Sequence, residues 1–175
     1  FQGEKEYARS ITQSDGSWKF EEVPWGHYIV REIAALAGYE QAEQEYEVTV
    51  DRSHREIQIP AILNRVQKGS AKIVKKSEDG AAEGFEFLLE GISDTGKPIR
   101  RTACTDFTGK AILEDIPAGT YTLSEIRNDE TERYVPAESQ LAVITSNSVT
   151  EVSFFNRLKK GKVQLIKADA EKPDR

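Results

Sequence analysis

The feature that most restricts the fold of this 175-residue chain is an internal repeat. Residues 12–33, TQSDGSWKFEEVPWGHYIVREI, align without a gap on residues 105–126, TDFTGKAILEDIPAGTYTLSEI. Each copy later ends in Asn-Arg, at Asn64 and at Asn156, so the period is about 92 residues. A repeat of this length is too long for a solenoid unit and suits a small independent domain.

The phase of the repeat predicts three segments. Residues 1–66 are expected to form a partial domain that lacks its first strand or strands, and residues 67–158 a complete domain. Residues 159–175 are expected to be a linker and the first strand of a third repeat. The chain has no methionine, so we expect a processed product or an excerpt of a longer protein. Phe1–Gly3 either match the end of a common protease-tag site or close a native strand.

Short alternating apolar segments within the complete repeat predict strands, because Gly, Pro, Asp and Asn separate them at turn positions. These segments are SAKIVKK (70–76), FEFLLEG (85–91), KAILEDI (110–116), TYTLSEI (120–126), QLAVITS (140–146) and TEVSFFN (150–156). No segment keeps a helical period over three turns. The sequence therefore predicts an all-β fold of tandem antiparallel β-sandwich domains, immunoglobulin-like in layout.

Composition and motifs argue against several functional classes. The net charge of −6 disfavours nucleic-acid binding, and no apolar run approaches membrane-spanning length. His27 and His54 belong to no catalytic cluster, and Cys104 cannot form an internal disulfide. The acidic stretches KSEDGAAEG and RNDETE lack the spacing of a calcium loop. We therefore expect neither an enzyme that turns over, nor a metal site, nor a cofactor.

Three polar residues lie where strand alternation points toward the predicted core: Lys75, Glu125 and Asn156. Each continues an apolar stripe, and a charge buried in that way must be paired, neutralised or reacted. Alternatively, each is a strand-end residue that leaves the core for solvent. The repetition of the set as Glu32, Asn64 and Lys167 favours the inward interpretation.

These residues resemble the Cna B-type domains, the SpaA-like prealbumin-fold modules of Gram-positive surface proteins and pilins. The resemblance is carried by GSAKIVKKSEDG…GFEFLL, TDFTGKAILEDIPAGTYTLSEI and VSFFN, and it covers the whole complete repeat. It implies an intramolecular isopeptide bond in which Lys75 supplies the amine, Asn156 the amide, and Glu125 promotes the reaction. Lys76 is a rival amine, but alternation and the alignment of Lys75 with Lys167 favour Lys75.

The resemblance also assigns roles in the partial repeats. Glu32 and Asn64 match the promoter and the amide of the first repeat, and Lys167 matches the amine of the third. Residues 161–169 can then be expected to pair with the strand-deficient first repeat, within one molecule or by strand exchange between chains.

The function implied by the resemblance is that of a structural stalk or spacer in an adhesin or pilin-like protein. Such a module is extracellular and attached to the cell wall by an anchor outside this stretch, and its partners are neighbouring domains of the same protein. A second hypothesis is a module that binds a host extracellular protein or a glycan through Trp18, Trp25 and Tyr28. A third is a domain accessory to a secreted enzyme.

Overall fold

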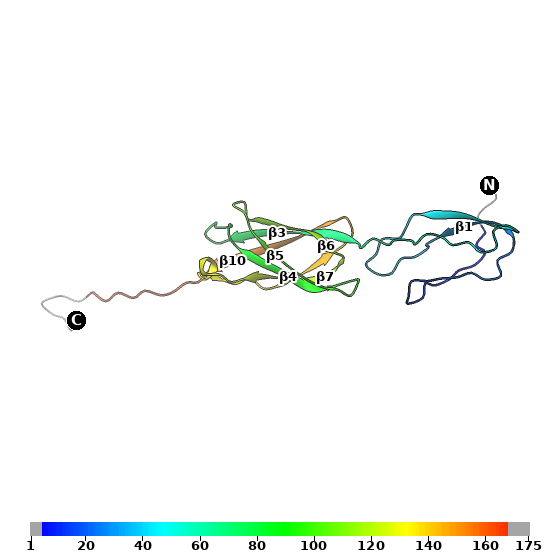
Figure 1. Ribbon diagram of the computed structural model, residues 1–175. Coiled ribbons are helices and arrows are strands. Elements are labelled where there is room, and N and C mark those ends of the chain that lie inside the picture. The colour runs from blue at the N-terminus through cyan, green and yellow to red at the C-terminus, as the bar shows by residue number, and fades with distance from the viewer. Residues whose placement is uncertain (1–4, 168–175) are drawn as a thin grey trace. The chain divides into compact units, whose positions relative to one another are not determined.

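The computed structural model describes residues 5–167, which divide into two compact units (Figure 1). Unit 1 comprises Phe1–Ala35 and Gln41–Asn64, and unit 2 comprises Leu36–Glu40 and Arg65–Arg175, each over its described residues. The chain thus divides next to Asn64, where the first repeat was expected to end. The predicted domain limits, and the third repeat, stay predictions.

Unit 2 is a sandwich of two four-stranded sheets, with the strand orders β6-β3-β10-β8 and β5-β4-β7-β9 (Figure 1). Its strands are β3 (Lys68–Ser77), β4 (Glu86–Ser93), β5 (Pro98–Cys104), β6 (Lys110–Pro117), β7 (Gly119–Ile126), β8 (Tyr134–Val135), β9 (Gln140–Ile144) and β10 (Val149–Leu158). A single 3-10 turn, η1 (Asp129–Thr131), precedes β8. All six predicted strands of the complete repeat are present, so the all-β fold class is confirmed.

The sequence did not predict β5, whose residues PIRRTAC carry two arginines and little apolar alternation. β5 is an edge strand that pairs only with β4, and edge positions tolerate such charged sequences. β8 was also missed, because a strand of two residues is too short to show a period.

The first and last strands of the sandwich, β3 and β10, lie side by side and run parallel. Every other strand pair in unit 2 is antiparallel. The sandwich is therefore antiparallel, as predicted, except for this one parallel pair. Because β3 and β10 occupy the two middle positions of their sheet, they bring the start and the end of the repeat together at the centre of the unit.

The core between the two sheets is built from the inward residues of both. Ile73 of β3, Leu89 of β4 and Leu123 of β7 are fully buried there, and Phe87 packs on Phe154 with ring centroids 4.8 Å apart. Burial of a side chain of this size contributes about 1.5–3 kcal/mol to stability. The strict in–out alternation of β3 and β10 follows from their facing this core on one side only.

Unit 1 forms a smaller part of the same architecture. Its only strands among residues 5–64 are β1 (Gly26–Arg31) and β2 (Glu45–Val50), which pair antiparallel. They match β7 and β9, because Gly26 is paired with Val50 as Gly119 is paired with Ile144. Tyr28 donates a hydrogen bond to the Pro24 carbonyl (2.8 Å), as Tyr121 does to Pro117 (2.7 Å).

The second sheet does not form in unit 1. Residues 17–24 and 57–64 align with β6 and β10, yet neither segment is a strand. In unit 2 the strand β3 lies between β6 and β10 and hydrogen-bonds to both. Residues 5–64 contain no counterpart of β3, so the two flanking segments have no strand to pair with.

A glycine next to Lys75 provides a test of this packing. Gly109 has φ of 75°, and a Cβ placed on it would lie 2.5 Å from the Lys75 carbonyl oxygen. Gly96 has nearly the same φ, 78°, but a Cβ there would meet nothing within 4 Å.

We therefore expect Gly109→Ala to destabilise unit 2 by about 3 kcal/mol or more, from backbone strain plus the clash. The control, Gly96→Ala, should cost only about 1–2 kcal/mol, from its left-handed backbone. Amide hydrogen exchange of β3 and β10 in each variant measures the two effects. Equal effects would show that the Gly109 contact does not constrain the fold.

Candidate functional site

Two predicted site residues lie on the neighbouring parallel strands. Lys75 of β3 and Asn156 of β10 are buried, with 1% and 0% of their surface exposed. Lys75 is opposite Phe154, and Asn156 is opposite Ser77, so the two side chains are diagonal neighbours on the core face. Lys76, the rival amine, is exposed. The inward direction predicted from the alternation is therefore correct for both residues.

The third predicted residue, Glu125, comes from the opposite sheet. It lies near the end of β7, paired with Phe87 of β4, and is partly buried. The Asn156 amide nitrogen Nδ2 donates to both carboxylate oxygens of Glu125, at 2.6 Å to Oε1 and 2.8 Å to Oε2. A side-chain contact thus joins the two layers of the sandwich at this point.

The Asn156 carbonyl oxygen Oδ1 is buried and has no hydrogen-bond partner among the described residues. A buried amide oxygen without a partner costs about 1–3 kcal/mol. Glu125 contacts the amide nitrogen of Asn156 and not this oxygen. Glu125 is therefore placed beside the atom that would leave if the amide carbon were attacked.

The Lys75 amine lies in an aromatic environment. Its Nζ donates to the Lys76 carbonyl oxygen at 2.8 Å and lies 3.9 Å from the centroid of the Phe85 ring. The Tyr134 ring centroid is 6.0 Å away. The faces of aromatic rings attract an ammonium group, but this attraction compensates for only a small part of the hydration free energy that the group loses on burial.

Burial shifts both titrating groups toward their neutral forms. It lowers the pKa of Lys75, although the nearby charges of Glu125 and Asp79 act in the opposite direction. It raises the pKa of Glu125, against the hydrogen bond from Asn156 and the charges of Lys75 and Arg127. A neutral amine is a nucleophile and a neutral carboxylic acid is a proton donor, so this site can support acyl transfer to the amine.

In unit 1, the counterparts of Glu125 and Asn156 are Glu32 and Asn64, and these two side chains are in contact. Asn64 Nδ2 donates to Glu32 Oε1 at 3.0 Å, and the Ala42 backbone N–H donates to Glu32 Oε2 at 2.7 Å. Asn64 is exposed, however, whereas Asn156 is buried. This difference agrees with the absence of the second sheet from residues 5–64.

Lys167 lies in the segment 159–167, which forms neither strand nor helix. Pairing of residues 161–169 with unit 1 stays a prediction, and residues 168–169 lie outside the described part of the chain.

The remaining candidates from the sequence are His27, Cys104, Trp18 and Trp25. His27 is exposed and contacts Thr49 at 2.8 Å, and Cys104 is exposed at the end of β5. Trp25 is 66% exposed, whereas Trp18 is half-buried with its ring against Phe20. Residues 5–167 contain no group of three or more His, Cys, Asp or Glu side chains that could hold a metal ion. Within the same residues no helix is long and apolar enough to cross a membrane.

The sequence analysis did not single out three residues that meet beyond the end of β3: Asp79, Arg133 and Tyr134. Asp79 lies in the acidic stretch KSEDGAAEG, which lacks the spacing of a calcium loop. Its carboxylate nevertheless binds Tyr134 and Arg133. The sequence feature that could have pointed to these residues is Tyr134, which follows the aligned segment of its repeat at nearly the same distance as Tyr39 does in the first repeat.

Comparison with known proteins supports the predicted resemblance. Residues 2–62 match the family model of the SpaA prealbumin-like fold domain, which confirms the resemblance to SpaA-like modules. No curated protein sequence matches the chain. The matched residues fall almost entirely within unit 1, and unit 2 is related to them by the repeat.

Among solved structures, the Bacillus anthracis TIE protein matches with a TM-score of 0.65 and 24% identity, over 84% of this chain and 28% of that protein. The chain thus spans little more than a quarter of that protein. The minor pilin GBS52 of Streptococcus agalactiae matches with a TM-score of 0.47 and 18% identity, over 89% of this chain and 70% of the pilin. The major pilin SpaD of Corynebacterium diphtheriae matches with a TM-score of 0.44 and 16% identity, over 53% and 30%. At 24% identity the match to the TIE protein shows the fold alone.

Because the pKa of Lys75 is lowered, we expect its positive charge to destabilise the folded state by an amount that depends on pH. Because the folded-state pKa lies below the ordinary 10.5, the folded state disfavours the ammonium, and stability should rise with pH through the folded-state pKa. We compare Asn156→Ala with the double variant that adds Lys75→Met, so that neither contains a Lys75–Asn156 bond.

The double variant should be more stable at pH 7, and its advantage should shrink as the pH approaches 10.5. Hydrogen exchange of β3 amides, corrected for the intrinsic effect of pH on exchange, measures the difference. A pH-independent difference would mean that burial does not disfavour the Lys75 charge.

Proposed function

We propose that unit 2 forms an intramolecular isopeptide bond between Lys75 and Asn156, promoted by Glu125. The observation that carries the proposal is the buried Asn156 amide, held by both Glu125 oxygens beside the strand that carries buried Lys75. The exposed neighbour Lys76 has none of this environment.

The reaction follows from the arrangement. The neutral Lys75 amine attacks the Asn156 side-chain carbonyl carbon, so that a bond from Nζ to this carbon forms and the bond to Nδ2 breaks. Glu125 accepts the proton released by Nζ and returns one to Nδ2, which leaves as ammonia. The carboxyl group is regenerated, but the product stays attached to the chain. The step therefore occurs once per molecule and is not enzymatic turnover.

The bond would close a covalent loop across most of unit 2. By the loop-closure relation for cross-links, a loop of this length contributes about 4–5 kcal/mol, in a model-dependent estimate. The mechanical effect follows from the strand order. Force enters unit 2 at β3 and leaves at β10, which are neighbours, so a bond between them would carry the load past the rest of the sandwich.

The function we propose is therefore a rigid spacer in a cell-surface protein of a Gram-positive bacterium. The match of residues 2–62 to a SpaA prealbumin-like domain supports this role, and two similar folds belong to proteins named as pilins. Its partners would be neighbouring domains of the same protein, and its anchor would lie outside this stretch. An adhesive activity would belong to another part of that protein.

The bond is tested by intact mass. The wild-type chain should be lighter than its sequence mass by one ammonia, and Lys75→Ala and Glu125→Ala should abolish the loss. Lys76→Ala is the matched control and should retain it. A wild-type mass equal to the sequence mass would refute the bond. A second ammonia loss, or a covalent dimer, would instead indicate a bond between Asn64 and Lys167.

The spacer role is tested by stretching single molecules from their termini. In the wild type the segment between Lys75 and Asn156 should not extend, because the bond bypasses it. Lys75→Ala should release roughly 280 Å of additional contour length, at about 3.3–3.6 Å per residue. The absence of a difference between the two chains would contradict a load-bypassing bond.

A further inference from the structure

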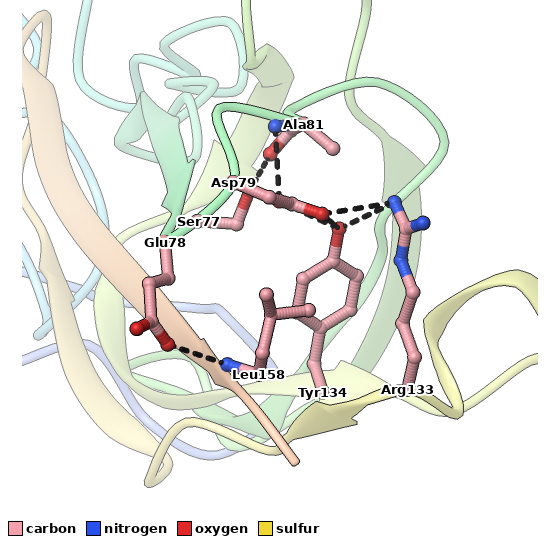
Figure 2. Close-up of polar contacts among 7 residues, drawn as sticks. All are labelled: Ser77, Glu78, Asp79, Ala81, Arg133, Tyr134 and Leu158. Atoms are coloured by element: carbon pink, nitrogen blue, oxygen red, sulfur yellow. Dashed lines mark hydrogen bonds and ion pairs between the residues drawn. The ribbon is translucent and has the colours of Figure 1, made fainter. Parts of the chain in front are cut away.

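A cluster of polar side chains lies beyond the end of β3, and none of them exchanges a bond or a proton in the proposed reaction (Figure 2). The Tyr134 hydroxyl donates to both carboxylate oxygens of Asp79, at 2.9 Å each. Arg133 donates to the Tyr134 hydroxyl at 2.7 Å and lies 3.2 Å from Asp79 Oδ2. We call Asp79, Arg133 and Tyr134 the tyrosine lock.

Asp79 is itself fixed by the turn that carries it. Ser77 Oγ and the Ala81 backbone N–H donate to Asp79 Oδ1, at 2.9 and 3.2 Å. Burial alone would raise the pKa of Asp79, but the hydrogen bonds from Tyr134 and Ser77 and the charge of Arg133 bring it below its ordinary value. Asp79 is therefore a carboxylate at neutral pH, held in one position.

The same turn is tied to β10 beside Asn156. The Glu78 backbone N–H donates to the Asn156 backbone carbonyl oxygen at 2.9 Å. The Leu158 N–H donates to the Glu78 carboxylate at 3.0 Å (Figure 2). Leu158 is in turn the register partner of Tyr134 in the β10–β8 pair. The lock thus connects the ends of β3 and β10 with β8.

The lock determines where the Tyr134 ring lies. The ring is buried, packs on Phe85 with centroids 5.4 Å apart, and faces the Lys75 amine together with Phe85. A hydroxyl held by Asp79 and Arg133 leaves the ring no freedom to turn away. The charged groups that act on Lys75 from other elements are Glu125 of β7 and Asp79 of the turn.

We propose that the tyrosine lock positions the Tyr134 ring so that, with Phe85, it keeps water from the Lys75 amine. Tyr134 is thus a positioning residue for the Lys75–Asn156 reaction, and this role rests on the proposed function. Engagement of Asp79 by Tyr134 and Arg133 also matters, because a free carboxylate near Lys75 would favour the unreactive ammonium.

The decisive variant is Tyr134→Phe, which keeps the ring and removes only its hydroxyl. Tyr121→Phe is the matched control, since Tyr121 is also buried and also donates one hydrogen bond, to Pro117, about 13 Å along β7 from Glu125. In an Asn156→Ala background, NMR titration should show a higher Lys75 pKa in Tyr134→Phe and an unchanged one in Tyr121→Phe. Arg133→Ala, a change at a largely exposed side chain, should act in the same direction as Tyr134→Phe.

The reaction rate provides the second measurement. Each unit by which the Lys75 pKa rises makes the neutral amine tenfold scarcer at neutral pH. With Asn156 present, Tyr134→Phe should therefore lose ammonia more slowly than the wild type after cell-free synthesis at pH 7, by a factor set by the pKa rise that the titration measures, and a higher pH should restore the rate.

The outcomes separate the two proposals. An unchanged Lys75 pKa in Tyr134→Phe, or an unchanged rate, would overturn the lock. If the wild type never loses ammonia, the proposed bond does not form. The titration in the Asn156→Ala background still tests whether the tyrosine lock keeps water from the Lys75 amine.

Discussion

The parallel pairing of β3 with β10 is the constraint on which the rest of unit 2 depends. It places the first and last strands of the repeat in the middle of one sheet, and hydrogen bonds from both sides of this pair recruit β6 and β8. It also makes Lys75 and Asn156 neighbours, although they are far apart in the sequence. The opposite sheet then needs only to supply one acidic side chain, which Glu125 provides.

Unit 1 shows what happens without this pair. Its sequence aligns without a gap on that of unit 2 over the β6 and β7 segments and keeps the turn and strand residues Pro24, Gly26 and Tyr28. Only the strands of the β7–β9 type form among residues 5–64. This agrees with the general rule that strand formation depends on pairing partners as well as on the strand's own sequence. The Glu32–Asn64 contact is present although the segment that carries Asn64 is not a strand.

Much of the fold could be predicted from the sequence, for identifiable reasons. β3 and β10 alternate strictly, and β7 alternates over its first five residues, since each faces the core on one side; this alternation also revealed Lys75 and Asn156 as inward residues. Register and direction were not predictable, because alternation is the same in parallel and antiparallel strands. β5 lacked the signal because it is a charged edge strand. Asp79 was missed because its partners, Arg133 and Tyr134, approach it only after β8 pairs with β10.

The distance along the chain between β3 and β10 also sets an order of events during synthesis. Lys75 leaves the ribosome before every strand that surrounds it, and Asn156 is among the last residues of the unit to appear. At about 5–20 residues per second, roughly 4–16 s separate the two. Throughout this interval the amine has no core to remove it from water, and it remains an ordinary charged lysine. The proposed bond could therefore form only after translation has delivered the whole unit, and a chain still being synthesised would stay extensible.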